Sequence, residues 1–315
     1  MAESPDSFFK ATSDPTAKDP KTKFPLDGYD ILKVPKVELV AAAATAPALH
    51  ALSSTRVARV SQDLVIKSSH SVLPSEAEAM KMVSQKTSIH LPRVYRSFTI
   101  QGTDGIYDST GYIVMDYVDG CSLTDCWSGL TVREREDIVK QVVDIIRQLQ
   151  SLRLPKPGPI GGGPSKGTWF SCYGAGPFAN RSEFEEYFNQ RLEIAKKTGS
   201  GGTQGHTPPF RFSTFVMTHL DITPRNLILD PKGRLWLIDW GYAGAYPPIF
   251  EPATLACQSE CPDFNDLVLQ RLAYDDQSFQ QLIGIRGVLH FRGAIDVCHF
   301  HALLNFSVIA SFANR

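Results

Sequence analysis

The sequence predicts an α+β protein with two lobes: an N-terminal antiparallel sheet with one helix, and a mostly helical C-terminal lobe that carries a β-hairpin. The first observation is that short β-type runs flank a single helical segment before Gly120. The second is that amphipathic helical patterns follow Gly120, and the third is that two short apolar runs joined by a turn interrupt them at 227–238. With 315 residues and 43% apolar composition, the chain is long enough for two such lobes.

The first 28 residues are rich in Asp, Lys, Pro and Ser and show no apolar period, so we predict that 1–28 is a flexible segment. The rest divides into an N-terminal lobe at 29–119 and a C-terminal lobe at 120–315, which meet at the Asp119-Gly120 break. The start of the chain carries an early acidic residue and no apolar core of signal-peptide length, so we expect no secretion signal.

Within the N-terminal lobe, β-branched and aromatic residues gather in four short runs separated by turn residues. One helix is expected between the second and third runs, where Ser75 and Glu78 form a capping box and an apolar stripe follows. The expected order is β-β-α-β-β, with strands at 56–60, 64–67, 94–100 and 112–118 and a helix ending near Lys86.

The C-terminal lobe should be organised around one long helix. A capping box of Thr131 and Glu134 opens it, and its apolar residues repeat at spacings of 4, 3, 4 and 3. The seam consists of Ile138, Val142, Ile145, Leu149 and Leu152. A Gly- and Pro-rich stretch at 155–167 is expected to be a loop, and a capping box of Ser182 and Glu185 predicts a further helix.

A β-hairpin is predicted from two apolar strands at 227–229 and 234–238. The turn at 230–233 has Pro at its second position and Gly at its fourth. In an antiparallel hairpin the residue entering the first strand lies beside the residue leaving the second, so Asn226 and Asp239 should lie close together. Amide and carboxylate oxygens suit a hard cation such as Mg²⁺, which takes further ligands from water and phosphate.

Asp221 precedes Asn226 by five residues, on a loop that Pro224 should keep out of a helix. It can point at the same site and act as a base or orient water. His219 is expected to brace this loop by hydrogen bonds. For Arg225 two roles are open: contact with a transferred phosphate, or a salt bridge that braces the loop.

The pattern His219-x-Asp221-x-x-x-x-Asn226, followed after a hairpin by Ile238-Asp239-Trp240, has the layout of kinase catalytic and metal loops. It closely resembles the aminoglycoside phosphotransferase and choline kinase-like family of small-molecule kinases. The resemblance covers roughly 55–252 and implies a bilobal, protein-kinase-like fold. In detail the segment is most similar to the branch common in fungi, in which Leu220 replaces a small residue.

The resemblance implies roles for two residues of the N-terminal lobe. Lys67 ends a strand at the position where kinases place the lysine that contacts the α and β phosphates of the nucleotide. Glu76 resembles the family glutamate that pairs with this lysine. Glu78 is the competing candidate, and we assign it to the capping box instead.

The nucleotide-binding hinge and the phosphate-covering loop follow from the same resemblance. Met115 lies in the strand that would line the adenine, with the backbone groups of Asp116 and Val118 as expected hydrogen-bond partners. The loop between the first two strands contains no glycine, which departs from the Gly-rich pattern. We expect Ser53 or Ser54 to donate to a phosphate there.

The function implied is an ATP-dependent phosphotransferase that phosphorylates a hydroxyl group of a small molecule, with ATP and Mg²⁺ as cofactors. Asp221 would act as base, and Asn226 and Asp239 would bind the metal. An alternative is a kinase-like protein that binds a nucleotide or metabolite without catalysis, which the loop without glycine favours. A protein kinase is disfavoured because Ile-Asp-Trp stands where Asp-Phe-Gly is expected.

Charge limits the partners that we expect. The chain has 32 Lys and Arg against 33 Asp and Glu, a formal net charge of −1, whereas nucleic-acid binders usually carry a basic excess. The most apolar internal stretch, 37–52, contains Glu38 and Pro47 and falls short of the roughly 20 residues of a membrane-spanning helix. We therefore expect a cytoplasmic monomer or homodimer with neither a nucleic-acid nor a membrane partner.

Two sequence features have competing interpretations. The six cysteines form no CxxC pair, which favours free thiols, and the Cys298-His-Phe-His301 segment would place its two His on different helix faces, which argues against a metal site. Residues 251–315 hold seven acidic residues against four Arg. These acids could select a cationic substrate, but a solvated helix face is the favoured interpretation.

Overall fold

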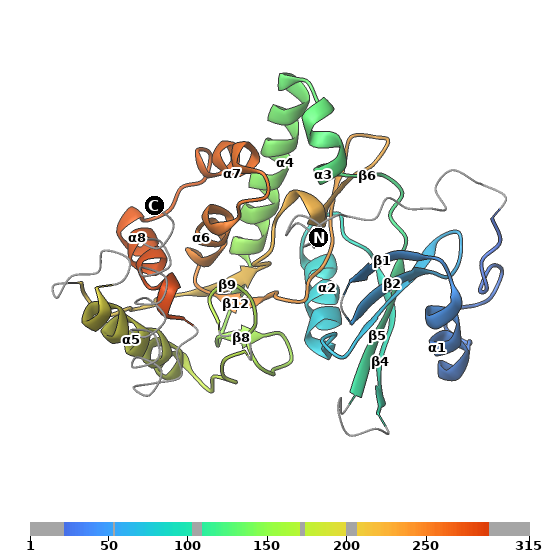
Figure 1. Ribbon diagram of the computed structural model, residues 1–315, viewed down its shortest axis with the longest axis horizontal. Coiled ribbons are helices and arrows are strands. Elements are labelled where there is room, and N and C mark those ends of the chain that lie inside the picture. Colours follow the sequence, from blue (N-terminus) through green and yellow to red (C-terminus); the bar gives the residue numbers. More distant parts are fainter. Residues whose placement is uncertain (1–21, 53, 103–108, 171–173, 200–206, 290–315) are drawn as a thin grey trace, which may run out of the picture.

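The computed structural model describes residues 22–52, 54–102, 109–170, 174–199 and 207–289. Figure 1 shows two lobes side by side: a strand-rich N-terminal lobe, and a mostly helical C-terminal lobe beyond α2. This arrangement confirms the predicted α+β architecture.

The N-terminal lobe is built on a five-stranded antiparallel sheet of order β1-β2-β3-β5-β4. The strands are β1 (Ala48–Leu52), β2 (Thr55–Arg59), β3 (Leu64–Ser69), β4 (Val94–Gln101) and β5 (Ser109–Asp116). Helix α2 (Pro74–Lys86) connects β3 to β4, so the predicted β-β-α-β-β series is present. The sequence did not predict β1 or the preceding helix α1 (Lys36–Thr45).

Both faces of this sheet are covered. On one face Ala58, Ile66 and Val114 share a core with buried residues of α1. On the other face Ile113 and Met115 belong to the larger core that α2 and the C-terminal lobe also enter. Because residues opposite each other in an antiparallel sheet point to the same face, Lys67, which pairs with Ile113, faces α2.

Part of the predicted flexible N-terminal segment packs on this lobe. Phe24 and Leu26 are buried, and the backbone N–H of Leu26 donates to the carbonyl of Val60 at 2.9 Å. Burial of these two apolar side chains packs this part of the segment against the sheet. Residues 1–21 lie outside the described residues.

The helices of the C-terminal lobe are α3 (Leu123–Cys126), α4 (Val132–Ser151), α5 (Arg181–Thr198), α6 (Phe250–Cys257), α7 (Pro262–Leu269) and α8 (Asp276–Gly284). Short 3₁₀ turns occur at η2 (Trp127–Gly129), η4 (Pro224–Asn226) and η5 (Arg286–Val288). Helix α4 begins as predicted, because the side chains of Thr131 and Glu134 cap each other's backbone N–H groups.

Two small antiparallel sheets complete the C-terminal lobe. One has the order β11-β10-β6, from β6 (Cys121–Ser122), β10 (Leu227–Leu229) and β11 (Leu235–Leu237). The other has the order β7-β9-β12-β8, from β7 (Arg153–Leu154), β8 (Gly158–Pro159), β9 (Phe215–Thr218) and β12 (Gly244–Tyr246). The first contains the predicted hairpin, and the second places a short strand inside the predicted loop at 155–167.

The predicted capping box of α2 is wrong. The helix begins at Pro74, whose missing N–H and fixed φ suit a first helical position, and Leu73 before it makes no side-chain cap. Glu78 lies on the exposed surface and pairs with Lys81 at 2.9 Å. Neither Glu76 nor Glu78 caps α2, and the two carboxylates have different partners.

The start of α5 also differs from the prediction. Asn180 is the N-cap, and its side chain accepts the backbone N–H of Glu183 at 3.1 Å. Asn180 competes successfully with Ser182 because Asn is at least as good an N-cap. Glu185 instead accepts the backbone N–H of Phe212 at 2.8 Å and pairs with Arg211 at 3.0 Å.

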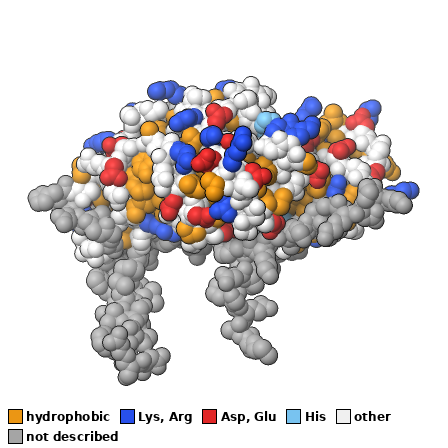
Figure 2. Space-filling view, turned by 90° about the horizontal axis from the view of Figure 1, so that it is seen from above, with side chains coloured by type: hydrophobic (Ala, Val, Ile, Leu, Met, Phe, Trp, Pro, Cys, Tyr) orange, Lys and Arg blue, Asp and Glu red, His pale blue; other side chains and the backbone are white. Residues whose placement is uncertain are grey.

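Several expectations about the surface can be compared with the described residues. Cys121, Cys126, Cys257 and Cys261 are free thiols, as expected, while the Cys298-His-Phe-His301 segment lies outside the described part. No helix in the described ranges has the length and apolarity needed to cross a bilayer. On the face shown in Figure 2, Lys and Arg are interspersed with Asp and Glu.

Candidate active site

The hairpin places Asn226 and Asp239 within one residue of register at its open end. Leu227 pairs with Leu237, and the backbone N–H of Ile238 donates to the carbonyl of Asn226 at 3.0 Å, which leaves Asp239 one residue beyond the register. The turn closes as predicted, with the N–H of Gly233 donating to the carbonyl of Asp230 at 2.9 Å. Local turn chemistry is therefore what aligns the two side chains.

The connection between the lobes runs close to this hairpin. Strand β6, directly after Gly120, pairs with β10. A Cβ atom at position 120 would lie 2.5 Å from the carbonyl oxygen of Leu229, so only glycine allows this approach. The lobe junction is thereby attached to the strand that follows Asn226.

Lys67 joins the two lobes electrostatically. Its Nζ donates to Oε1 of Glu76 at 2.7 Å and to Oδ1 of Asp239 at 2.8 Å. The side chains of Lys67 and Glu76 are buried, whereas that of Asp239 is 50% exposed. The structure thus brings three of the predicted site residues into one cluster, with the Asp239 carboxylate at its open side.

The charges in this cluster determine its protonation. Burial lowers the pKa of Lys67, but Asp239 and Glu76 outweigh burial and hold it above the ordinary value. The Lys67 charge lowers the pKa of Asp239 to about 2. Burial is the largest influence on Glu76 and raises its pKa, against the opposing effect of Lys67. Lys67 is therefore a firmly charged ammonium, and Asp239 is a firmly ionised carboxylate.

The carboxylate of Asp221 is 11% exposed and is held from both sides. Oδ2 accepts Nδ2–H of Asn226 at 2.8 Å, and Oδ1 accepts Arg225 at 2.7 Å and Gln258 at 3.2 Å. Burial raises the pKa of Asp221, while Arg225 opposes that change. The η4 turn that carries Arg225 and Asn226 fixes this arrangement, in agreement with the prediction that Pro224 prevents an α-helix there.

His219 is fully buried and braces the loop. Its Nδ1 accepts the backbone N–H of Asp221 at 3.2 Å, so its Nε2 carries the proton and donates to the carbonyl of Ile238 at 3.1 Å. Burial lowers the pKa of His219 to about 4, which keeps the ring neutral. The contacts are those of the bracing role expected from the sequence.

A buried carboxylate that the sequence analysis did not single out holds the same loop. Glu251 in α6 is 1% exposed and accepts the backbone N–H groups of His219 at 2.6 Å and Leu220 at 3.0 Å. Leu220 has φ = 64° and Asp239 has φ = 62°, so both residues adopt the left-handed backbone conformation that non-glycine residues rarely adopt. Such strain persists only where surrounding contacts maintain it, and Glu251 supplies that contact at Leu220.

The donor set of Asn226 and Asp239 fits a hard cation. Asn226 uses Nδ2 to donate to Asp221, which turns its Oδ1 toward the opposite side, where it has no hydrogen-bond partner among the described residues. One carbonyl oxygen and one ionised, half-exposed carboxylate are the few protein ligands that Mg²⁺ takes beside phosphate oxygens. Within the described ranges, no group of three or more His, Cys, Asp and Glu forms a separate metal site.

The hinge residues lie at the end of β5. Met115 is 9% exposed and belongs to the main core. The N–H of Asp116 donates to the carbonyl of Arg93, and its side chain accepts from Arg93 and Tyr95. Asp116 can therefore offer a ligand its carbonyl oxygen only, whereas the N–H of Val118 has no partner among the described residues.

The loop before β2 contains Ser54, one of the two residues expected to donate to a phosphate. The Ser54 hydroxyl lies 3.1 Å from that of Ser69 and 3.4 Å from Nε2 of His70, so it bonds within the sheet. Ser53 lies outside the described residues. Strand β1 instead offers His50, in the same cross-strand row as Val57 and Lys67 and therefore on the same face.

His50 is electrostatically close to the cluster. Burial lowers its pKa, Asp239 raises it and Lys67 lowers it. His50 was not among the predicted site residues, because strand β1 was not predicted.

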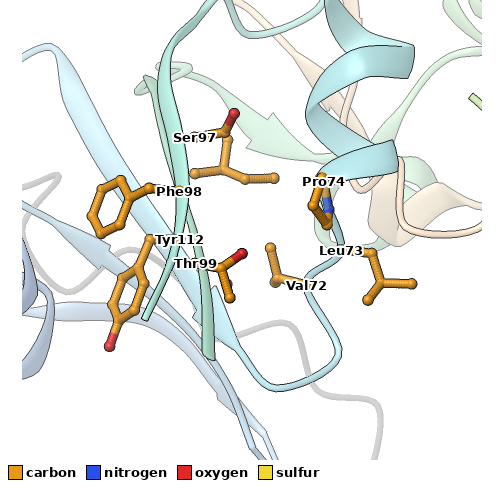
Figure 3. Close-up of a pocket in the computed structure, with 9 residues that line it drawn as sticks. Val72, Leu73, Pro74, Ser97, Phe98, Thr99 and Tyr112 are labelled. Atoms are coloured by element: carbon orange, nitrogen blue, oxygen red, sulfur yellow. The ribbon is translucent and has the colours of Figure 1, made fainter. Parts of the chain in front are cut away.

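The pocket in Figure 3 lies outside this site. Its volume is about 60 Å³, and it is lined by the segment before α2 together with β4 and β5, including Val72, Pro74, Thr99 and Gly111. A pocket of that size is far below the roughly 300 Å³ or more of a ligand site. None of the predicted site residues lines it.

The fold and the charged cluster together define the class of protein: a kinase-like, two-lobed molecule in which a lysine, a glutamate and an aspartate meet between the N-terminal sheet and the hairpin of the C-terminal lobe. The sequence model described as "Phosphotransferase enzyme family" matches residues 45–282, well over half of the chain. The chain belongs to this family. A comparison of the sequence with curated proteins found no match.

Solved structures agree with the fold. The GDP complex of wild-type aminoglycoside 2′-phosphotransferase-IIIa superposes with a TM-score of 0.52 at 14% identity, covering 76% of this chain and 80% of that one. The GDP complex of a mutant of that enzyme gives a TM-score of 0.51 at 15% identity, covering 84% and 91%. The predicted kinase-like fold is confirmed, and this degree of identity is evidence for the fold alone.

Proposed function

We propose that the protein is an ATP-dependent phosphotransferase that phosphorylates a hydroxyl group of a small molecule. Membership of the phosphotransferase family supports the general reaction. The observation that carries the proposal is the convergence of Lys67 and Asp239 at 2.8 Å beside a catalytic loop with Asp221 and Asn226 joined at 2.8 Å. Such groups supply what phosphoryl transfer requires, namely positioning and charge stabilisation.

The nucleotide is proposed to lie between the lobes. Glu76 holds Lys67, whose ammonium would contact the α and β phosphates in place of its present contact with Asp239. Met115, the carbonyl of Asp116 and the N–H of Val118 would contact the base. Ser54 is a proposed phosphate donor, and its hydroxyl can donate to a phosphate while it accepts a hydrogen bond from Ser69. The similar structures were solved with GDP, which supports a nucleotide in this position.

Mg²⁺ is proposed to be held by Oδ1 of Asn226 and the carboxylate of Asp239, where it would neutralise charge on the phosphate chain. The remaining chemistry belongs to the chain itself. Asn226 donates Nδ2–H to Asp221, so the same side chain connects the metal site to the base. His219 fixes the loop from below without carrying charge.

Asp221 is proposed to accept the proton of the acceptor hydroxyl during in-line transfer. Oδ1 has two donors, whereas Oδ2 has only Asn226 and keeps a free lone pair. Since the transition state of phosphoryl transfer is loose, orientation of the hydroxyl should matter more than strong basicity.

The acceptor is not identified by these residues. Most acids after α6 have protein partners: Glu260 binds Arg225, Asp263 binds Trp127, and Asp275 caps α8. This distribution supports the interpretation that the acidic excess is structural and not a receptor for a cationic substrate. The fungal-type branch, the lobe boundary at 119/120, the cytoplasmic location, the absence of a nucleic-acid partner and the monomer or homodimer state stay predictions.

The experiment is a thermal-shift titration with ATP or ADP and Mg²⁺, followed by measurement of ATP turnover, on the wild type and Asp239→Ala. Ligand binding raises the melting temperature in proportion to the logarithm of ligand concentration above Kd. We expect stabilisation and turnover in the wild type, and loss of turnover in Asp239→Ala. Turnover at the wild-type level in Asp239→Ala would overturn the proposed metal site.

A second candidate is a kinase-like protein that binds a nucleotide or metabolite without catalysis. The glycine-free loop before β2, with its Ser54 hydroxyl bonded to Ser69, favours it. The presence of Lys67, Glu76 and Asp239 in one cluster opposes it. Nucleotide-dependent stabilisation without any phosphoryl transfer to water or metabolites would favour this candidate.

A further inference from the structure

Asp221 accepts a hydrogen bond from a segment that has no role in the proposed mechanism. This segment, residues 258–261, connects α6 to α7. Gln258, 37 residues after Asp221, donates Nε2–H to its Oδ1 at 3.2 Å. Glu260 is connected to the same oxygen through Arg225. One N–H of the Arg225 guanidinium donates to Oε2 of Glu260 at 2.7 Å, and an N–H on the other terminal nitrogen donates to Oδ1 of Asp221 at 2.7 Å.

The 258–261 segment is itself fixed by contacts with two helices. Asn265 in α7 is 3% exposed and donates Nδ2–H to the carbonyl of Gln258 at 2.9 Å. The hydroxyl of Thr124 in α3 lies 3.5 Å from Oε1 of Glu260. Helices α3 and α7 lie on either side of α4 in Figure 1. The segment is therefore a fixed support for the Asp221 carboxylate.

The ion pairs that link Asp221, Arg225 and Glu260 are partly buried. The side chains of Arg225 and Glu260 are only 26% and 20% exposed. Partly buried pairs are screened less by salt than exposed ones, and the planar guanidinium binds carboxylates with a defined orientation. A change at Glu260 should therefore turn Arg225 and, through it, Asp221.

We propose that Gln258, Arg225 and Glu260 form a positioning relay that aims the carboxylate of Asp221 at the acceptor hydroxyl. The inference rests on the proposed phosphotransfer. Both donors engage Oδ1, so the relay leaves Oδ2 as the oxygen that receives the proton. None of the three touches the reacting atoms, and each acts through Asp221.

A different role for Arg225 would give a different result. If its guanidinium contacted the transferred phosphate, removal of Glu260 would free Arg225 to do so and would change nucleotide affinity. A positioning role predicts an effect on the rate of transfer with unchanged nucleotide affinity.

The test compares Glu260→Gln, Arg225→Lys and Arg225→Ala with the wild type. Glu193→Gln is the matched control, because Glu193 forms an exposed helix pair with Lys196 at 2.8 Å. The readouts are the single-turnover rate of ATP·Mg²⁺ transfer to water, the KM for ATP and the dissociation constant of ADP. Melting temperature reports whether each variant is folded.

We expect Glu260→Gln to lower the transfer rate about tenfold and Arg225→Ala to lower it 10- to 100-fold, with ADP affinity within about twofold of the wild type. Arg225→Lys should lie between Arg225→Ala and the wild type, and added guanidinium should partly restore Arg225→Ala. The Glu193→Gln control should match the wild type.

The relay is overturned if folded Glu260→Gln retains the wild-type rate, or if the variants raise the KM for ATP while the maximal rate is unchanged. A wild type that binds ADP but shows no transfer would overturn the proposed function, and the relay with it. These outcomes differ in the wild-type measurement, so the two failures are distinguishable.

Discussion

Glu251→Gln tests the buried carboxyl group that accepts the backbone N–H groups of His219 and Leu220. Glu251 is 1% exposed, and burial raises its pKa to about 7 from an ordinary value of 4.5, against the two backbone N–H groups that it accepts. An acid whose pKa rises on folding stabilises the folded state below its ordinary pKa, and that contribution disappears as pH rises through the folded value. Glu251 should therefore stabilise the fold more at pH 5 than at pH 8.

The size of this effect follows from the shift. A pKa difference of about 2.5 units corresponds to about 3 kcal/mol over the full range, of which about 2.5 kcal/mol should be lost between pH 5 and pH 8. Gln cannot ionise, so the free energy of unfolding of the wild type minus that of Glu251→Gln should fall by this amount across that interval. The comparison removes the contributions of other titrating groups that both proteins share.

The assay is urea unfolding followed by tryptophan fluorescence at pH 5, 6, 7 and 8. Glu193→Gln makes the same chemical change at an exposed helix position and is the matched control. A flat difference for Glu251→Gln would refute the reasoning. So would a difference that grows with pH, because that is the behaviour of a carboxylate stabilised in its charged form.

Four further substitutions have defined expectations. Thr131→Ala removes the N-cap of α4 and should cost about 1 kcal/mol in urea unfolding, with little effect on nucleotide binding. Gly111→Ala places a Cβ 2.0 Å from the carbonyl oxygen of Val72 and should cost about 2 kcal/mol, whereas Gly129→Ala, where a Cβ meets nothing within 4 Å, should cost far less by the same measurement. Lys67→Met should abolish the rise in melting temperature caused by ADP and Mg²⁺; an unchanged rise would exclude Lys67 from the nucleotide site.

Features that depend on residues close together in the sequence could be predicted. The hairpin follows from the 230–233 turn, and its register places Asn226 beside Asp239 without any knowledge of the rest of the fold. The capping box of Thr131 is local as well. Asp221 and Asn226 are only five residues apart, so their hydrogen bond required no long-range information.

Hydrogen bonds between residues far apart in the sequence could not be predicted in the same way. Glu251 binds backbone groups 31 and 32 residues away, and Gln258 binds a side chain 37 residues away. No spacing rule connects such residues, because their contact depends on how α6 packs against the catalytic loop. Both look like ordinary polar residues in the sequence.

Two kinds of local prediction failed for physical reasons. Capping boxes at Ser75 and Ser182 lost to better starting residues nearby, namely Pro74 at a first helical position and Asn180 as an N-cap. Helix α1 was missed because its buried face consists of Leu39, Ala42 and Ala43, which give little contrast with the alanines around them. Strand β1, which follows α1 directly, was not predicted either, and so His50 was not predicted as a site residue.

The central claim is transfer of a phosphoryl group from ATP to a small-molecule hydroxyl. The most direct measurement is mass spectrometry of a metabolite extract incubated with the protein, Mg²⁺ and ATP carrying heavy oxygen in its γ-phosphoryl group. We predict that the wild type produces at least one metabolite that has gained a labelled phosphoryl group, and that Asp221→Asn and Asp239→Ala do not. A nucleotide-binding wild type that labels no metabolite, or equal labelling by Asp239→Ala, would contradict the account.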